Sequence, residues 1–264
     1  MLYPFSNATR LAHITIVVEG EQLQEEEAKS LVQSLGGTPA LHCLEYSGLD
    51  VPTAEAMARS MPLLNQLTTL RLVVRHYHCV EPALHVIRKC TSATWILLSS
   101  RGPGHWGFID IDAWPSLHLP NLRILEIGET VILPLFHCPN LQVLSISSKP
   151  HLVALQVVPT YISTSKHSLQ VLRLQAMQRY DLTWFFRNRD FIRIPILEVR
   201  TMRDEKVGLD GIRKEVLDRM WERLGGSRAP TFAAYGTGVT ALGWVDSKVF
   251  HLFSEYFENT RKFV

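Results

Sequence analysis

Apolar residues recur along the chain in one short phrase: an apolar residue, two others, a second apolar residue, one other, and a third apolar residue. The first apolar residues of the eight copies are Leu11, Leu41, Leu67, Ala93, Leu122, Leu141, Leu169 and Ile194. Successive copies therefore begin 30, 26, 26, 29, 19, 28 and 25 residues apart. Within each phrase the last positions alternate between apolar and other residues, which predicts a strand with one buried face.

This spacing predicts a stacked architecture. One copy cannot bury its own apolar face, whereas stacked copies bury a common core. Most spacings lie in or beside the window of about 20–29 residues that is typical of leucine-rich repeats. We therefore expect an α/β fold, a leucine-rich-repeat solenoid or horseshoe, with parallel strands on the concave face and helices on the convex face. Repeat lengths vary and the asparagine that usually follows the phrase is absent, which predicts an irregular solenoid.

Several connectors between the phrases predict helices. Segment 22–35 carries spaced apolar residues and ends at two glycines, which is a helix stop signal. Further helices are expected over 53–64, over 82–90, and after Asp181, whose side chain can cap one. We expect the solenoid to span 1–206. A C-terminal helical cap should cover 207–264, with helices over 209–224 and 245–257 and a glycine-rich loop over 229–243 between them.

Composition narrows the class of partner. Hydrophobic residues make up 46% and charged residues 20% of the chain, which indicates a folded protein. A net charge of +2 gives no general attraction to nucleic acid or to anionic membrane, and we expect neither partner. No apolar stretch is long enough for a membrane span, and no secretory signal is recognisable. Together with four cysteines lacking a C-x-x-C pair, this predicts a cytoplasmic or nuclear location.

Residues between the buried positions of each phrase should form two columns on the opposite, concave face. The first column would contain His13, Cys43, Thr69, Trp95, Ile124, Val143, Val171 and Ile196. The second would contain Thr15, Glu45, Arg71, Leu97, Glu126, Ser145, Arg173 and Glu198. Because Trp and Arg dominate binding hot spots, we expect a protein partner on this face. The predicted binding residues are Arg71, Trp95, Glu126, Arg173 and Glu198.

Other candidate chemistry is weak. A group of histidines and cysteines, His76, His78, Cys79, His85 and Cys90, lacks the spacing of a zinc knuckle, so no metal and no cofactor is expected. No nucleophile elbow, metalloprotease or phosphate-loop motif occurs, and the chain is not expected to be an enzyme. The Gly/Pro-rich loop over 99–116 could bind a partner, but a surface loop packed on the solenoid is favoured. The aromatic, arginine-rich segment 184–193 could bind single-stranded nucleic acid, but aromatics at this spacing more often belong to a core.

The phrases that begin at Leu119-Pro120-Asn121-Leu122 and at Cys138-Pro139-Asn140-Leu141 resemble repeats of F-box/leucine-rich-repeat proteins, above all the fungal F-box-like set. The resemblance covers the repeat region, roughly residues 8 to 200, and no F-box precedes the first repeat in this chain. It implies a substrate-binding part of a cullin-RING ubiquitin ligase receptor, with a ligase adaptor as a partner if an F-box lies upstream. The alternative is a leucine-rich-repeat scaffold or sensing array of another signalling protein.

Overall fold

The computed structural model describes residues 10–101, 110–146, 157–164, 169–177, 196–201, 229–235 and 239–245. The chain forms two compact units, Met1–Leu141 and Gln142–Val264. The division at residue 206 that the fading repeat predicted stays a prediction.

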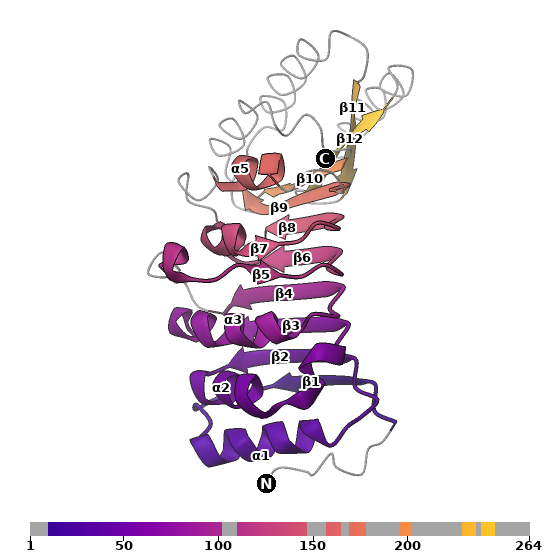
Figure 1. The fold of residues 1–264 in the computed structure, drawn as a ribbon. Coiled ribbons are helices and arrows are strands. Elements are labelled where there is room, and N and C mark those ends of the chain that lie inside the picture. Colours follow the sequence, from indigo (N-terminus) through magenta and orange to yellow (C-terminus); the bar gives the residue numbers. More distant parts are fainter. Residues whose placement is uncertain are drawn as a thin grey trace. The chain divides into compact units, whose positions relative to one another are not determined.

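The first unit is an α/β fold in which a parallel sheet alternates with helices (Figure 1). Its main sheet contains β1 (His13–Val17), β2 (Cys43–Leu49), β3 (Thr69–Val74), β4 (Trp95–Ser100) and β6 (Ile124–Ile127), and each strand pairs in parallel with the next. The α helices are α1 (Glu25–Gly36), α2 (Val51–Ser60) and α3 (Val80–Lys89). The 3₁₀ helices are η2 (Pro62–Gln66), η3 (Tyr77–Cys79), η4 (Ile111–Ala113) and η5 (Thr130–Leu135). A small parallel pair joins β5 (Leu117–His118) and β7 (Phe136–His137).

Buried apolar columns form the core of the first unit, as the phrase predicted. The second positions, Leu44, Leu70, Ile96 and Leu125, and the third positions, Tyr46, Leu72, Leu98 and Ile127, are all almost inaccessible to solvent. The first apolar residue of five phrases closes a turn, because its N–H donates to the carbonyl three residues earlier. The acceptors of these turns are Thr38, Leu64, Cys90, Leu119 and Cys138, and all five are buried. Cys90 and Cys138 therefore occupy equivalent packing positions.

A shared backbone acceptor fixes the stagger between neighbouring repeats. The carbonyl of His42, just before β2, accepts the N–H groups of Thr68 and Thr69 at the start of β3. The carbonyls of Ala12, Thr68 and Thr94 each accept two N–H groups in the same way, at the start of β2, β4 and β6 respectively. The hydroxyl of Thr68 adds a third hydrogen bond to His42 O. Because the same geometry repeats, the strands stack in register, and His13, Cys43, Thr69, Trp95 and Ile124 lie side by side.

Side-chain amides also tie the repeats together, from the position just before each first leucine. Asn121 donates to Thr91 O, and Asn140 donates to Pro120 O. Gln66 reaches back to the carbonyls of Pro39 and Leu41. The asparagine that usually follows the phrase is absent, but amides on the other side of the strand link successive turns instead.

The helices agree with the sequence pattern except at their ends. The helix predicted over 22–35 is α1, and that predicted over 82–90 is α3. The helix predicted over 53–64 was too long, because α2 stops at Ser60 and a separate 3₁₀ helix begins at Pro62. Proline disfavours helical backbone in the residue before it, and Met61 is extended. Among the described residues, no helix has the length and hydropathy to cross a bilayer.

The buried carboxylate of Asp50 joins two elements of the first unit. One oxygen accepts the Thr53 N–H, 3.0 Å away, and so caps the start of α2. The other accepts the N–H of Leu23, 2.9 Å away, in the segment that leads into α1. A single residue thus holds both helices against the sheet.

The second unit continues with parallel strands and then changes direction. It contains β8 (Val143–Ile146), α5 (Val157–Thr164), β9 (Val171–Met177) and β10 (Ile196–Thr201), and β9 pairs in parallel with both β8 and β10. β12 (Val239–Val245) pairs antiparallel with β10 and with β11 (Ala229–Tyr235). The prediction of a loop over 229–243 was wrong, because pairing with β10 makes this segment a hairpin. Two predicted helices, the one after Asp181 and the one over 209–224, lie outside the described residues. So does the helix predicted over 245–257, except for its first residue. The helical cap therefore stays a prediction.

Gly20 and Gly48 both have positive φ, and alanine substitutions at these positions measure how tightly β1 and β2 are packed. Gly20 has open space around it, whereas a Cβ at Gly48 would lie 2.4 Å from Val18 O. We expect Gly20→Ala to cost about 1–2 kcal/mol for the left-handed backbone, and Gly48→Ala to cost about 1–3 kcal/mol more for the clash. Chemical denaturation of both variants measures the difference, and equal losses would show that β1 moves away freely.

Candidate functional site

The side of the first unit's sheet that faces away from α1, α2 and α3 is called the open face here (Figure 1). Its side chains are the alternate strand residues, and the strand register aligns them in the two columns that the sequence predicted. Within the first unit these are His13, Cys43, Thr69, Trp95 and Ile124, and Thr15, Glu45, Arg71, Leu97 and Glu126. The two residues from β1 are exposed, and the others are partly buried.

Three of the five predicted binding residues lie in one chain of contacts across the open face. Arg71 Nη1 donates to Glu45 Oε1 at 2.9 Å, and the guanidinium carbon of Arg71 lies 5.4 Å from the centroid of the Trp95 ring. On the next strand, Trp95 Nε1 donates to Glu126 Oε1 at 2.8 Å. Each side chain is therefore held by a neighbour on an adjacent strand. Glu45 was placed in its column but was not among the predicted binding residues.

The energies of these contacts are modest individually. The Arg71–Glu45 pair is partly exposed, with side-chain exposures of 36% and 26%, so it contributes about 0.2–1 kcal/mol at most. An exposed cation–π contact adds about 0.5–1 kcal/mol. Arg71 Nε is buried and has no acceptor among the described residues. The arrangement thus orders the guanidinium without satisfying all of its donors.

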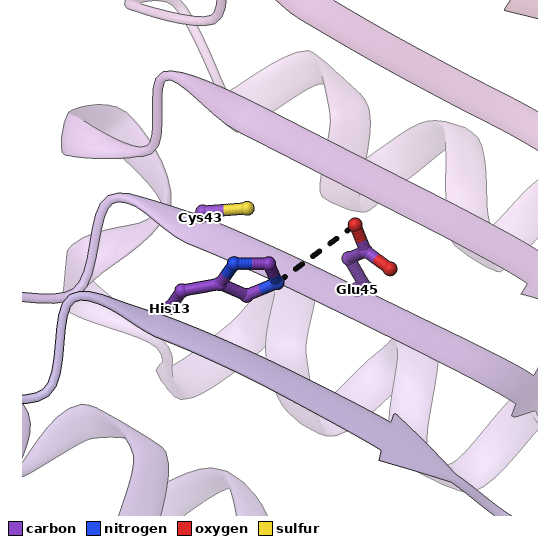
Figure 2. A group of neighbouring side chains, drawn as sticks. All are labelled: His13, Cys43 and Glu45. Carbon is purple, nitrogen blue, oxygen red and sulfur yellow. Dashed lines mark ion pairs between the residues drawn. The ribbon is translucent and has the colours of Figure 1, made fainter.

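The contact chain extends to the first strand through a second group of side chains. His13 Nε2 lies 3.8 Å from Glu45 Oε1, and the thiol of Cys43 stands beside both (Figure 2). Burial and the negative charge of Glu45 raise the pKa of the Cys43 thiol, while Arg71 and a hydrogen bond with Thr69 partly offset the rise. This end of the open face gathers an imidazole, a thiol and a carboxylate.

The remaining two predicted binding residues lie in the second unit. The register places Arg173 of β9 between Ser145 of β8 and Glu198 of β10, as predicted. Arg173 is partly exposed. Ser145 is fully buried, so the second column is not exposed throughout. Whether Arg173 and Glu198 act with Arg71, Trp95 and Glu126 stays a prediction.

The other sequence candidates have packing roles where they are described. Cys79 and Cys90 are buried, burial raises the pKa of the Cys90 thiol to about 12, and that thiol donates to Val86 O. His85 packs against Trp114 with ring centroids 4.7 Å apart. Of the loop 99–116, residues 102–109 lie outside the described residues, as does all of 184–193.

A hollow on the helix side lies between α2 and α3. Its lining residues are Glu55, Ala58, Arg59, His78, Glu81, Pro82, His85, Arg88 and Lys89. Both signs of charge meet here, and Arg59 already pairs with Glu55. Mixed solvated charges are usual on the outer face of surface helices, so the open face is the better candidate site.

Glu129 is a residue that the repeat pattern did not single out. It follows β6, immediately before η5, and burial raises its pKa to about 7. No apolar spacing marks this position, because the residue lies in an irregular connector.

The raised pKa of Glu129 predicts a pH-dependent stability. The folded state binds this proton more tightly than the unfolded chain, whose carboxyl has its ordinary pKa of 4.5. The stabilisation by protonated Glu129 is therefore present at low pH and is lost as the pH rises from 4.5 through about 7. We expect the protein to lose stability relative to Glu129→Gln between about pH 5 and about pH 8 in chemical denaturation. A pH-independent difference would contradict the desolvation of this carboxyl.

Comparison with known proteins gives no family assignment. Neither the protein-family models nor the curated proteins yielded a match to this chain. The function must therefore be argued from the open face and its contacts.

Proposed function

We propose that this chain is a non-catalytic protein-recognition module built as a leucine-rich-repeat solenoid, with the open face as its concave binding surface. Sequential parallel strands, the position of α1, α2 and α3 on the same side of the first unit's sheet and a repeated backbone acceptor between repeats support this proposal. A doubly wound fold would place helices on both faces of its sheet. Among the described residues of the first unit, α1, α2 and α3 leave the open face available to a partner.

The observation that carries the proposal is the ordered contact chain from Glu45 through Arg71 and Trp95 to Glu126. Tryptophan and arginine are the residues most enriched in hot spots. Side chains that already hold a fixed geometry lose less conformational entropy when a partner binds. Neighbouring carboxylates and the stacked ring supply that order here.

The surroundings of this chain indicate the chemistry of the partner. Leu97 and Ile124 lie next to Trp95, on the same and the next strand, and are partly exposed. A partner would place an apolar side chain on this strip, which supplies desolvation. Its polar groups would meet Arg71 and the two carboxylates, which fix register more than affinity.

We further propose that the partner is a substrate of a cullin-RING ubiquitin ligase, for which this chain would be the receptor's binding part. Support comes from the resemblance of the Leu119 and Cys138 phrases to F-box/leucine-rich-repeat proteins. A repeat scaffold of another signalling protein is the alternative. Recovery of the ligase adaptor and cullin with this chain separates the two.

Truncating the hot-spot pair should weaken binding selectively. The full chain is used as bait in its own cells, and the proteins recovered are identified by mass spectrometry and then assayed for direct binding. We expect Trp95→Ala with Arg71→Ala to weaken the direct complex about 30-fold or more, because the loss of even one hot-spot residue costs about 2 kcal/mol or more. Circular dichroism verifies that the variant is folded.

The matched control also removes one aromatic residue and one arginine, but on the helix side of the sheet. Tyr77→Ala with Arg88→Ala deletes an exposed aromatic residue and an arginine in η3 and α3. Binding should survive in this variant. Equal binding by the Trp95/Arg71 variant, or equal loss in the control, would overturn the open face as the binding surface. Recovery of a partner without the adaptor and cullin would overturn only the ligase assignment.

A further inference from the structure

We propose that His13, Cys43 and Glu45 form a Zn²⁺ site at the β1 end of the open face (Figure 2). One potential ligand atom from each side chain lies within 4.8 Å of the other two. The inference departs from the sequence expectation of no metal. It also goes beyond protein recognition, since the ion would bind without any partner.

The separations suit a single tetrahedral ion. Zinc binds thiolate sulfur at about 2.3 Å and imidazole nitrogen or carboxylate oxygen at about 2.0–2.2 Å, so its ligand atoms lie roughly 3.3–3.7 Å apart. His13 Nε2 and Glu45 Oε1 are already 3.8 Å apart. All three ligand atoms lie within 4.8 Å of one another, so the longest separation must shorten by about 1 Å for one ion to bind all three.

The backbone presents the three side chains without further rearrangement. His13 and Cys43 are register partners on adjacent parallel strands. Glu45 follows Cys43 by two residues, so it points to the same face of β2. The N–H groups of His42 and Cys43 both donate to Ala12 O and hold these strands in place. Rigid strands position metal ligands better than loops do.

The donor set selects zinc over the hard cations. Thiolate and imidazole are soft to intermediate ligands that favour Zn²⁺, whereas Mg²⁺ and Ca²⁺ require an all-oxygen set. On binding, the Cys43 thiol releases its proton to solvent. The thiolate and the Glu45 carboxylate then balance the charge of the ion.

Neighbouring side chains can support this site from an outer shell. Arg71 Nη1 donates to Glu45 Oε1, and Thr69 is hydrogen-bonded to Cys43. Such outer partners orient ligands in known zinc sites. Thr15 Oγ1 lies 3.2 Å from His13 Nε2, and this hydrogen bond would be replaced when Nε2 binds the ion. Three protein ligands with one open position is the arrangement of reactive rather than closed structural zinc.

A histidine pair elsewhere provides the competing site. The Nδ1 atoms of His118 and His137 lie 2.9 Å apart on β5 and β7, and both residues are exposed. This pair offers two imidazole ligands and no thiol. Loss of the pair therefore distinguishes adventitious histidine binding from the proposed site.

The test uses the full chain, reduced and stripped of metal with a chelator, and titrates it with Co²⁺ and then with Zn²⁺ alone. We expect one equivalent of Co²⁺ to give a thiolate-to-metal charge-transfer band and the intense visible bands of a four-coordinate ion, and Zn²⁺ to displace it. Cys43→Ser should abolish the charge-transfer band. It should weaken Zn²⁺ binding by at least about 100-fold, because even the loss of an outer-shell partner costs about 10–100-fold.

Two further variants and a stability measurement complete the design. His42→Gln, at an exposed neighbouring position, and His118→Gln with His137→Gln should leave the band and the stoichiometry unchanged. Zn²⁺ should raise the melting temperature of the parent protein but not that of Cys43→Ser. The proposal is overturned if the band persists in Cys43→Ser, if it disappears with the His118/His137 pair, or if no equivalent of Zn²⁺ binds. None of these results depends on a protein partner, so protein recognition is tested separately.

Discussion

One backbone carbonyl before each strand receives two N–H groups from the next repeat, and the remaining structure of the first unit follows from this contact. The carbonyls of Ala12, His42, Thr68 and Thr94 set an identical stagger for four successive strand pairs. With the stagger fixed, the second and third apolar residues of the phrases in β2, β3, β4 and β6 join buried columns. A slip by one residue would turn each column toward solvent, so the buried leucines and the shared carbonyls enforce the same register.

The same stagger determines what happens on the open face. Neighbouring strands lie about 4.8 Å apart, so long side chains on adjacent strands reach one another, both within a column and diagonally between the two columns. Glu45 and Arg71 pair, Arg71 stacks on Trp95, and the ring donates to Glu126. These contacts order the side chains of the open face, but they also leave Arg71, Glu45 and Glu126 already paired within the protein. A partner must therefore gain more from the ordered ring and guanidinium than it loses by competing with the existing carboxylates.

The proposed zinc site and the proposed binding surface share Glu45. The carboxylate accepts from Arg71 and lies near His13 and Cys43. A zinc ion would draw electron density from Glu45 and weaken its hold on the guanidinium. Arg71 would then be more available to a partner's carboxylate. Metal occupancy and partner affinity would consequently be coupled, and by linkage each would change the other equally.

The apolar phrase by itself determined the strands, their buried faces and the residues that share a column, because alternation is a local property of a strand. Local pattern could not reveal the amide ties from Gln66, Asn121 and Asn140, whose acceptors lie in the preceding repeat. The glycine-rich composition of 229–243 predicted a loop. This segment contains strands instead, because β12 pairs with β10 and not because of its local composition. The contacts of His13 with Cys43 and Glu45, and of Trp95 with Glu126, likewise join residues about thirty positions apart. Only the tertiary register brings such side chains together, since the distance between them depends on how the strands stack and not on the sequence between them.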